Sequence, residues 1–175
     1  MPEFSATSQR RLATCHPVLQ DLFEAIVKVY DCSIICGQRN EIEQNKAFNS
    51  GRFSKRYPFS KHNGNPSMGV DVAPWPIDWD DADRFYHFGG FVRGFAHSRG
   101  IKIRWGGDWD ADFDLKDQTF FDLVHFELVE APKEKQPDKD SNHTERRRPF
   151  GSRAPLVPSA EPSNPSGMIS DIPGK

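Results

Sequence analysis

The stretch Ser60–Trp79, SKHNGNPSMGVDVAPWPIDW, contains the segment from which the fold of this chain can be worked out. At its centre, GVDVA alternates with the period of a β-strand, which places Val70 and Val72 on one face and Asp71 on the other. The loop before this strand is rich in Gly, Pro, Ser and Asn and begins near His62. A carboxylate on a strand built to be buried needs a partner or a cation, because an unpaired buried charge is costly.

A second strand of the same kind, FDLVHFEL, follows near residue 125. Its alternation puts Val124, Phe126 and Leu128 on an apolar face, whereas His125 and Glu127 project the opposite way. From the residues alone two interpretations stay open. The polar side chains could hold a metal ion, or they could be a hydrogen-bonded aspartate and an ordinary core histidine.

The flanking segments predict both helices and strands. Ser8 suits a helix cap before QRRLATC, and Pro17 suits the first position of a second helix. Residues 40–50 suit a short polar helix, and a longer helix is expected from Asp80 or Asp81 to Ser98. The segments CSIICG and KIRW read as further strands. Short strands mixed irregularly with helices are typical of an α+β domain rather than a repeating parallel βαβ design.

The three cysteines, Cys15, Cys32 and Cys36, are an odd number, which disfavours a disulfide framework. Strand alternation through CSIIC predicts that Cys32 and Cys36 both point inward beside Ile34. We therefore expect the two thiols to be core packing rather than a metal-binding pair.

The composition changes near residue 130. Of 21 aromatic residues only Phe150 lies beyond that point, and residues 131–175 contain eight prolines. Such a segment cannot bury enough apolar surface to offset the entropy lost on ordering. The sequence therefore predicts a folded domain at 1–130 and a Pro-rich disordered tail at 131–175.

The charge balance limits the classes of partner. The tail carries eight Lys and Arg against six Asp and Glu, which leaves 15 against 19 in the folded part, a net charge of −4. Binding to a phosphate backbone needs a basic face, so nucleic acid is not an expected partner. No apolar run approaches the roughly 18–20 residues that span a bilayer, and MPEFSATSQRRL lacks the apolar segment of a secretory signal. We expect no membrane insertion and synthesis in the cytoplasm.

Several motifs occur together and in a characteristic order. An S-x-H element is followed by a loop, then G-V-D-V, and finally D-x-x-H in the last strand. This pattern resembles the zinc metallopeptidases that cleave wall peptides containing D-amino acids, and among them the phage L-alanyl-D-glutamate endopeptidases. The resemblance spans roughly residues 8–130. Further similar pieces are ICGQRNEIEQNKAFNSGR, VDVAPWPIDW, IRWGGDW and FDLVHFEL.

The resemblance implies a fold and a metal site. The fold would be a small mixed domain like that of the hedgehog and D-Ala-D-Ala peptidases, with a short antiparallel sheet flanked by helices. One Zn²⁺ per chain would be held by His62, Asp71 and His125. The usual motif places the aspartate seven residues after the histidine, whereas the interval here is nine. The extra residues fall in the turn-forming stretch NGNPSM, where an insertion is cheap.

The resemblance also implies catalytic and substrate-binding residues. Asp122 matches the catalytic carboxylate, and Arg39 matches the arginine that contacts the substrate or its developing oxyanion. Ser60 would lie beside the substrate, and Trp109, in the GGDW turn, is the tryptophan best suited to a groove. Core packing is the expected role of the other tryptophans. Glu127 is open to two interpretations, a partner that orients a metal ligand or a surface salt bridge.

The implied function is that of a phage endolysin that hydrolyses the L-Ala–D-Glu bond in peptidoglycan stem peptides. The enzyme would act as a monomer, collect in the host cytoplasm and reach the cell wall after the membrane is permeabilised. A D-Ala-D-Ala carboxypeptidase on the same zinc site is one alternative. A non-catalytic, zinc-stabilised wall-binding or virion structural protein is another, although it would need neither Asp122 nor Arg39.

Overall fold

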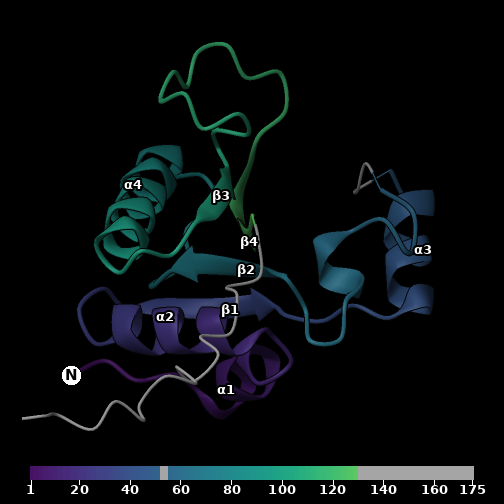
Figure 1. Ribbon diagram of the computed structural model, residues 1–175, viewed down its shortest axis with the longest axis horizontal. Helices are drawn as coiled ribbons and strands as arrows, with labels where there is room; N and C mark the ends of the chain where they lie inside the picture. Colours follow the sequence, from purple (N-terminus) through teal and green to yellow (C-terminus); the bar gives the residue numbers. More distant parts are fainter. Residues whose placement is uncertain (52–54, 130–175) are drawn as a thin grey trace, which may run out of the picture. The chain divides into compact units, whose positions relative to one another are not determined.

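The structure is a computed structural model that describes residues 1–51 and 55–129 (Figure 1). The predicted disordered tail at 131–175 lies outside the described residues. Helices and strands alternate irregularly, as predicted for an α+β domain. In chain order they are α1 (Ala6–Leu12), α2 (Pro17–Val27), β1 (Cys32–Cys36), α3 (Glu41–Asn49), the 3-10 turn η1 (Lys61–Asn63), β2 (Gly69–Pro74), α4 (Ala82–Ser98), β3 (Ile103–Gly106) and β4 (Asp122–Leu128).

The four strands form one antiparallel sheet in the order β1-β2-β4-β3. The alternation predicted for β2 is confirmed, and in β4 it holds from His125 to Leu128. The prediction for Val124 was wrong: this residue is only half-buried, and Leu123 packs against the core instead, next to an irregularity in the β3–β4 pairing. Val70 and Val72 of β2 and Phe126 of β4 are fully buried in the core, while Asp71 and His125 pair directly across the two strands. The neighbouring strands therefore present their polar side chains side by side on the face opposite the core.

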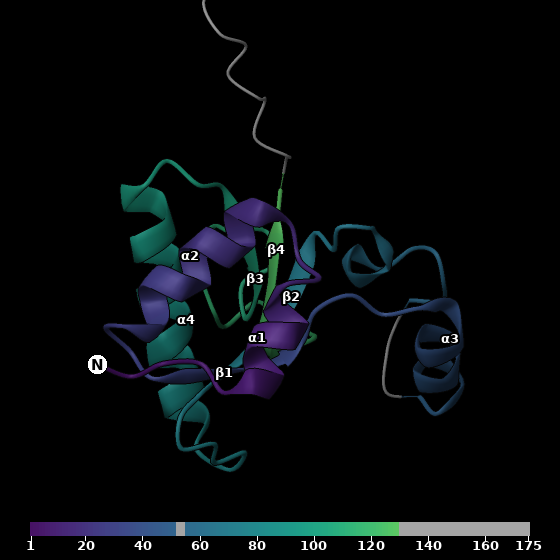
Figure 2. The ribbon, with the colours of Figure 1, turned by 90° about the horizontal axis from the view of Figure 1, so that it is seen from below.

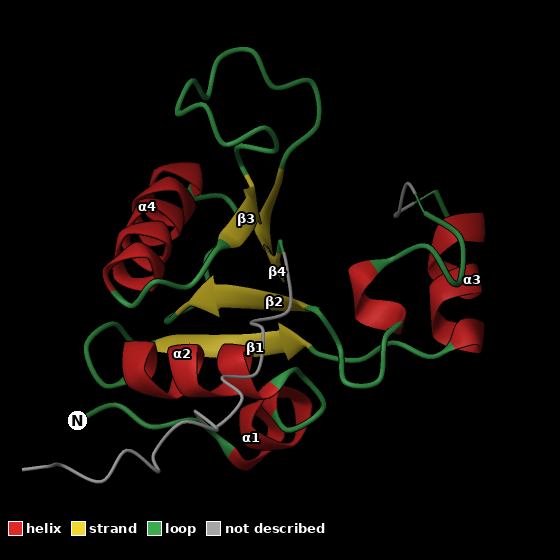
Figure 3. Cartoon of the chain, in the orientation of Figure 1, coloured by secondary structure: helices red, strands yellow, loops and turns green. Residues whose placement is uncertain are grey.

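Helices α2 and α4 supply the apolar side chains that cover the core face of the sheet (Figures 2 and 3). The apolar stripe of α2, formed by Leu19, Leu22, Phe23 and Ile26, is buried, and Phe23 packs edge-on against Phe126 at a centroid distance of 5.7 Å. On α4, Phe88 meets the same ring at 6.0 Å. Burying side chains of this size contributes about 1.5–3 kcal/mol each. The rigid layer beneath β2 and β4 thereby holds the polar face in position.

Helix α3 lies to the side of the sheet, next to η1 (Figures 1 and 2). Asn40 caps it in a reciprocal capping box with Glu43, which explains why so polar a sequence forms a helix. Its one buried residue is Gln44, which is 1% exposed. The Gln44 amide bonds the backbone carbonyl of Lys55 at 2.6 Å and so ties the helix to the chain that leads into η1.

The nine-residue interval between His62 and Asp71 is accommodated by a loop that packs on the α1–α2 connection. Ser67 accepts a hydrogen bond from the backbone of His16 and donates one to that of Thr14. The loop between His62 and Asp71 is thus held to the α1–α2 connection through both backbone groups of Ser67.

Three other local predictions were wrong. Ser8 lies inside α1, which Ser5 caps, and the Ser8 hydroxyl accepts the backbone N–H of Ile34 at 3.1 Å. Cys36 does not point into the core with Cys32, because an irregularity between Ile34 and Cys36 inserts one residue and pairs Cys36 with Asp71. Trp75 and Trp79 are 52% and 63% exposed rather than buried, whereas Trp105 is a core residue.

Within the described part of the chain, no helix combines the length and the apolar character needed to cross a membrane.

Candidate active site and metal centre

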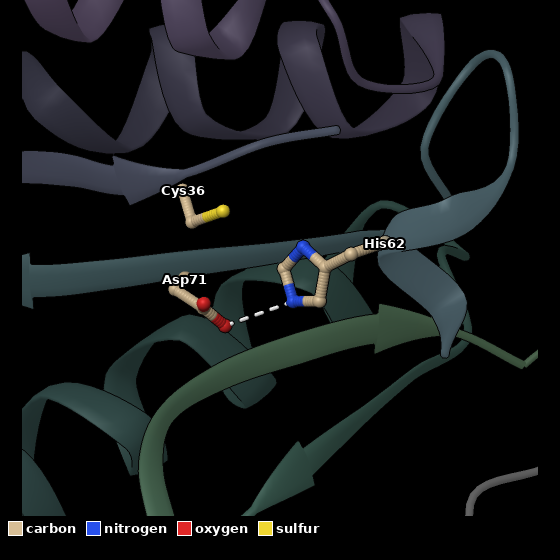
Figure 4. Close-up of side chains that lie close together, drawn as sticks. All are labelled: Cys36, His62 and Asp71. Carbon is tan, nitrogen blue, oxygen red and sulfur yellow. Dashed lines mark hydrogen bonds and ion pairs between the residues drawn. The ribbon is translucent and has the colours of Figure 1, made fainter. Parts of the chain in front are cut away.

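Three side chains predicted as metal ligands meet at one point on the polar face of the sheet. His62 comes from η1, Asp71 from β2 and His125 from β4. The Asp71 Oδ1 atom lies 3.0 Å from His62 Nε2 and 3.0 Å from His125 Nδ1, and the two nitrogens are 3.1 Å apart. Figure 4 shows the carboxylate of Asp71 directed at the His62 ring. All three side chains are buried.

The spacing and the donor set of this triangle match those of a metal site. Without an ion, each imidazole can carry a second proton and donate it to Asp71 Oδ1, so the same three side chains also form a hydrogen-bond network. Donor atoms about 2.0–2.1 Å from a tetrahedral zinc ion lie about 3.3 Å from one another, close to the spacing found here. Two imidazoles and one carboxylate are also the donor set of catalytic zinc sites, which keep a fourth position open.

The ring of His62 is held so that the correct nitrogen faces the site. Its Nδ1 atom donates to the Gly37 carbonyl oxygen at 2.6 Å, which leaves the lone pair of Nε2 directed at Asp71 and His125. Ser60 caps η1 and accepts the backbone N–H of His62 at 3.3 Å. Sequence reasoning identified His62 and Ser60 but not Gly37, since a backbone carbonyl leaves no signal in a residue pattern.

His125 adopts the opposite tautomer from His62, with its proton on Nε2. Its Nε2 atom donates to Glu127 Oε2 at 3.2 Å, which frees Nδ1 for the metal position. Glu127 is 1% exposed and also binds Arg104 through the guanidinium Nε at 2.8 Å. Burial alone would raise the pKa of Glu127, but the bonds from His125 and Arg104 outweigh it and lower the pKa to about 2. Glu127 thus contacts His125 and also forms a salt bridge with Arg104 that is buried on the Glu127 side. Its role as the partner of a metal ligand stays a prediction.

Arg39 is tied to the site through the second oxygen of Asp71. Its NH2 group lies 3.1 Å from Asp71 Oδ2, and its NH1 group donates to Gln44 Oε1 at 3.0 Å. Burial disfavours the ionised form of Asp71, yet the adjacent His62 and His125 more than offset this and hold the pKa of Asp71 well below its usual range. One oxygen of the Asp71 carboxylate thus contacts both histidines, and the other binds Arg39.

The other predicted site residues line the same pocket, which we call the catalytic pocket. Burial, and then the charge of Asp71, raises the pKa of Asp122 above that of an ordinary carboxyl group. The Trp109 ring lies against that of His125 in a tilted arrangement at a centroid distance of 5.7 Å, and it stacks on Phe120 at 6.0 Å. The lining residues are Arg39, Gln44, Lys55, Ser60, Lys61, His62, Asp71, Trp109, Phe120, Asp122, His125 and Glu127.

Two further groups of side chains have metal-ligand spacing in the described residues. Cys36 groups with His62 and Asp71, and its sulfur points toward the His62 ring (Figure 4). Only the strand irregularity brings it there, so sequence reasoning missed it. The second group is Asp108, Asp110 and Asp112. Asp108 already accepts Arg93 at 2.6 Å and the backbone N–H groups of Ala111 and Phe113, and it thereby anchors the loop that carries Trp109.

Comparison with known proteins agrees with this geometry. The family model described as phage L-alanyl-D-glutamate peptidase matches residues 2–129. The chain belongs to this family. It is 33% identical over 137 residues to the L-alanyl-D-glutamate peptidase of Escherichia phage T5, an alignment that covers 73% of this chain and 98% of that protein.

A solved structure supports the fold of this member of the phage L-alanyl-D-glutamate peptidase family. The L-Ala D-Glu endopeptidase ChiX of Serratia marcescens superposes with a TM-score of 0.57 at 24% sequence identity. The match covers 73% of this chain and 91% of that one. The predicted α+β architecture is therefore confirmed.

Replacing Glu127 with Gln should weaken zinc binding by about 10–100-fold, since partners that orient a metal-binding histidine typically contribute that much. The amide keeps the size of the side chain but loses the charge that binds His125 and Arg104. Competition with a chromophoric chelator measures the change. Glu24 is exposed on α2, and Glu24→Gln is the matched control. Equal zinc affinity in the two variants would show that Glu127 does not orient the ligand.

Zinc binding at pH 7 should release at least one proton. Burial lowers the pKa of the His62 imidazole, but the adjacent Asp71 carboxylate outweighs it and raises the pKa to about 10, and the pKa of His125 is raised as well. The metal-free site therefore holds protons at neutral pH that the ion must displace, so zinc affinity should rise with pH. Calorimetry in buffers of different ionisation enthalpy counts the protons. A heat independent of the buffer would contradict the expectation.

Proposed function

We propose that this protein is a zinc-dependent endopeptidase that hydrolyses the L-Ala–D-Glu bond of peptidoglycan stem peptides. Family membership supports the bond and the substrate. The observation that carries the proposed metal is the 3.0–3.1 Å triangle of His62, Asp71 and His125, in which each ring has its second nitrogen bonded elsewhere. A pocket next to this triangle contains the carboxyl group that hydrolysis requires.

In this proposal His62, Asp71 and His125 hold one zinc ion per chain. When bound, the ion supplies Lewis acidity, which polarises a carbonyl group and lowers the pKa of water to about 7. Two imidazoles and one carboxylate leave the site with a net charge of +1 that suits an anionic transition state. The protein's own part is to aim all three donor atoms at one point, where the ion would displace the protons that the histidines hold in its absence.

Asp122 is the proposed general base and then general acid. It lines the pocket that the metal ligands share, and its pKa is raised. A carboxylate of raised pKa takes a proton from water more readily than an ordinary aspartate does, and its acid form can then pass that proton to the far more basic departing amine. Asp122 would take a proton from the attacking water and deliver it to the nitrogen of the D-glutamyl residue.

Arg39 and the two substrate-binding candidates have supporting roles in the proposal. Arg39 lines the pocket while bound to Asp71, so its charge can offset that of the developing oxyanion and also hold a metal ligand. Ser60 and Trp109 line the pocket as well. Because Trp109 contacts the His125 ring and itself stacks on Phe120, we propose that it also helps to fix the plane of the ligand ring.

Digestion of purified peptidoglycan tests the function. Mass spectrometry of the products should show glycan strands whose stem peptides have been cut back to L-alanine, together with released peptides that begin with D-glutamate. Release of D-alanine instead would favour the D-Ala-D-Ala carboxypeptidase. Intact peptidoglycan after incubation with the zinc-loaded protein would favour a non-catalytic role in wall binding or virion structure. Metal analysis before and after chelation, paired with the same digest, tests the need for zinc.

We further propose that the protein acts as a monomeric catalytic domain at 1–130 followed by the Pro-rich segment at 131–175. It would collect in the host cytoplasm and reach the wall once the membrane is permeabilised. Fractionation of infected cells before and after lysis, with detection by antibody, tests the location.

A further inference from the structure

Two lysines line the catalytic pocket together with the metal ligands. Lys61 lies in η1 directly before His62, and Lys55 lies on the segment between α3 and η1. Among the residues that the structure describes, neither lysine forms an ion pair. Two lysines without an ion pair among the described residues therefore line the pocket of a domain whose overall charge is negative.

Two of the acidic residues of the pocket already have other cationic or histidine partners. Asp71 is bound by His62, His125 and Arg39, and Glu127 is bound by His125 and Arg104. The remaining acid, Asp122, is the one proposed to exchange protons with the substrate. The charge of the two lysines is thus available for a ligand that enters the pocket.

The backbone of each lysine is held in place. The buried Gln44 side chain donates to the carbonyl oxygen of Lys55 at 2.6 Å, while its own oxygen accepts from Arg39 at 3.0 Å. The Lys61 carbonyl oxygen accepts the backbone N–H of Met68 at 3.0 Å. The same buried amide that positions Arg39 therefore also positions Lys55, and the loop before β2 positions Lys61.

The chemistry of the substrate supplies an anion that these cations could bind. A glutamyl residue has two carboxyl groups, and only one of them can continue the peptide chain. The other remains a free carboxylate within a few bonds of the nitrogen that is released. Recognition of that group would explain why a D-glutamyl residue is required on the leaving side of the bond.

We propose that Lys55 and Lys61 form a carboxylate-binding subsite that selects substrates with a free acid on the leaving-side residue. The inference rests on the proposed function and adds to it the group that determines specificity. Hydrogen bonds between a charged donor and a carboxylate are stronger than neutral ones, so their loss should be measurable in KM.

Two matched peptides test the subsite with the full-length, zinc-loaded protein. One is an acylated L-Ala–D-Glu peptide with a free glutamyl carboxylate, and the other carries the carboxamide at that position. The wild-type protein should favour the acid in kcat/KM by about 10–100-fold, the range expected for charged hydrogen bonds. The preference should fall as ionic strength rises, because salt screens exposed charges.

The double variant Lys55→Met and Lys61→Met should cut both peptides with similar kcat/KM, through a higher KM for the acid and an unchanged KM for the amide. Its zinc content should equal that of the wild type. Lys28 is exposed at the end of α2, outside the catalytic pocket, and Lys28→Met is the control for the same loss of charge. Lys61→Arg should keep the preference, because the charge is retained.

Equal cleavage of the two peptides by the wild-type protein, or a preference that persists in the double variant, would overturn the subsite alone. Failure of the wild type to cut either peptide between L-Ala and the D-residue would overturn the proposed function and the subsite with it. Product analysis by mass spectrometry distinguishes these results. Should the double variant fold poorly, the single Lys55→Met variant changes only an exposed residue and should lose part of the preference.

Discussion

Exchanging Asp122 for Asn should reduce kcat by about 10²–10⁴-fold, the usual contribution of one general acid–base group. The amide has nearly the same shape but cannot accept the proton of water. None of the three proposed zinc ligands is altered, and Asp122 stands at the start of β4, half-buried, rather than in the core. The variant should therefore bind one zinc ion and melt at the temperature of the wild type.

The pH profile supplies a second check on Asp122. Burial and the charge of Asp71 raise its pKa, and a base must be deprotonated to act. Activity should therefore fall as the pH drops through this raised pKa, at a pH above the range of an ordinary aspartate. Asp21 is exposed on α2, and Asp21→Asn serves as the control. Lysis of permeabilised cells at the wild-type rate by the Asp122→Asn variant would sink the assigned mechanism.

Replacing His125 with Ala should remove both zinc and activity. Loss of a direct ligand should weaken zinc binding by more than the roughly 10–100-fold expected for the loss of an orienting partner such as Glu127. The change also leaves Asp71 and Glu127 without the imidazole that both now contact. Metal analysis after dialysis, together with turnover at fixed zinc concentration, measures both effects.

Thermal melting separates metal binding from general stability. An ion that binds only the folded state stabilises it by about 4 kcal/mol at a free concentration 1,000 times its Kd. Zinc should therefore raise the Tm of the wild type and of His97→Ala, a control on the exposed end of α4, but not that of His125→Ala. A zinc-dependent Tm that persists in His125→Ala would show that the ion is held elsewhere.

Much of the candidate site could be predicted from the sequence because its signals are local. A period of two in GVDVA and FDLVHFEL predicts which face each side chain takes. Strand β2 has that arrangement, and β4 has it from His125 to Leu128. The helical stripe on α2 and the caps of α3 and α4 depend on spacings of three and four residues. The ligand set, Asp122 and Arg39 needed the motif order as well as the pattern.

Other features depend on contacts between segments that are distant in the sequence, and no local sequence pattern indicates them. The buried amide of Gln44 belongs to α3, a helix with a largely polar sequence. The amide is buried because η1 and the segment near Lys55 pack around it. The pairing of Glu127 with Arg104 depends on the register between β3 and β4. Sequence reasoning could name Glu127 as a candidate partner of a ligand but could not identify the cation that holds it.

By itself the sequence determined that Asp71, His125 and Glu127 face away from the core, because within a regular stretch of strand the face depends only on the alternation. The tertiary structure alone decided that His62, Asp71 and His125 share one point, since this requires the register of β2 with β4 and a loop that returns η1 to the sheet. It also decided that Cys36 faces the site, because one extra residue in β1 reverses the side to which the following side chain projects.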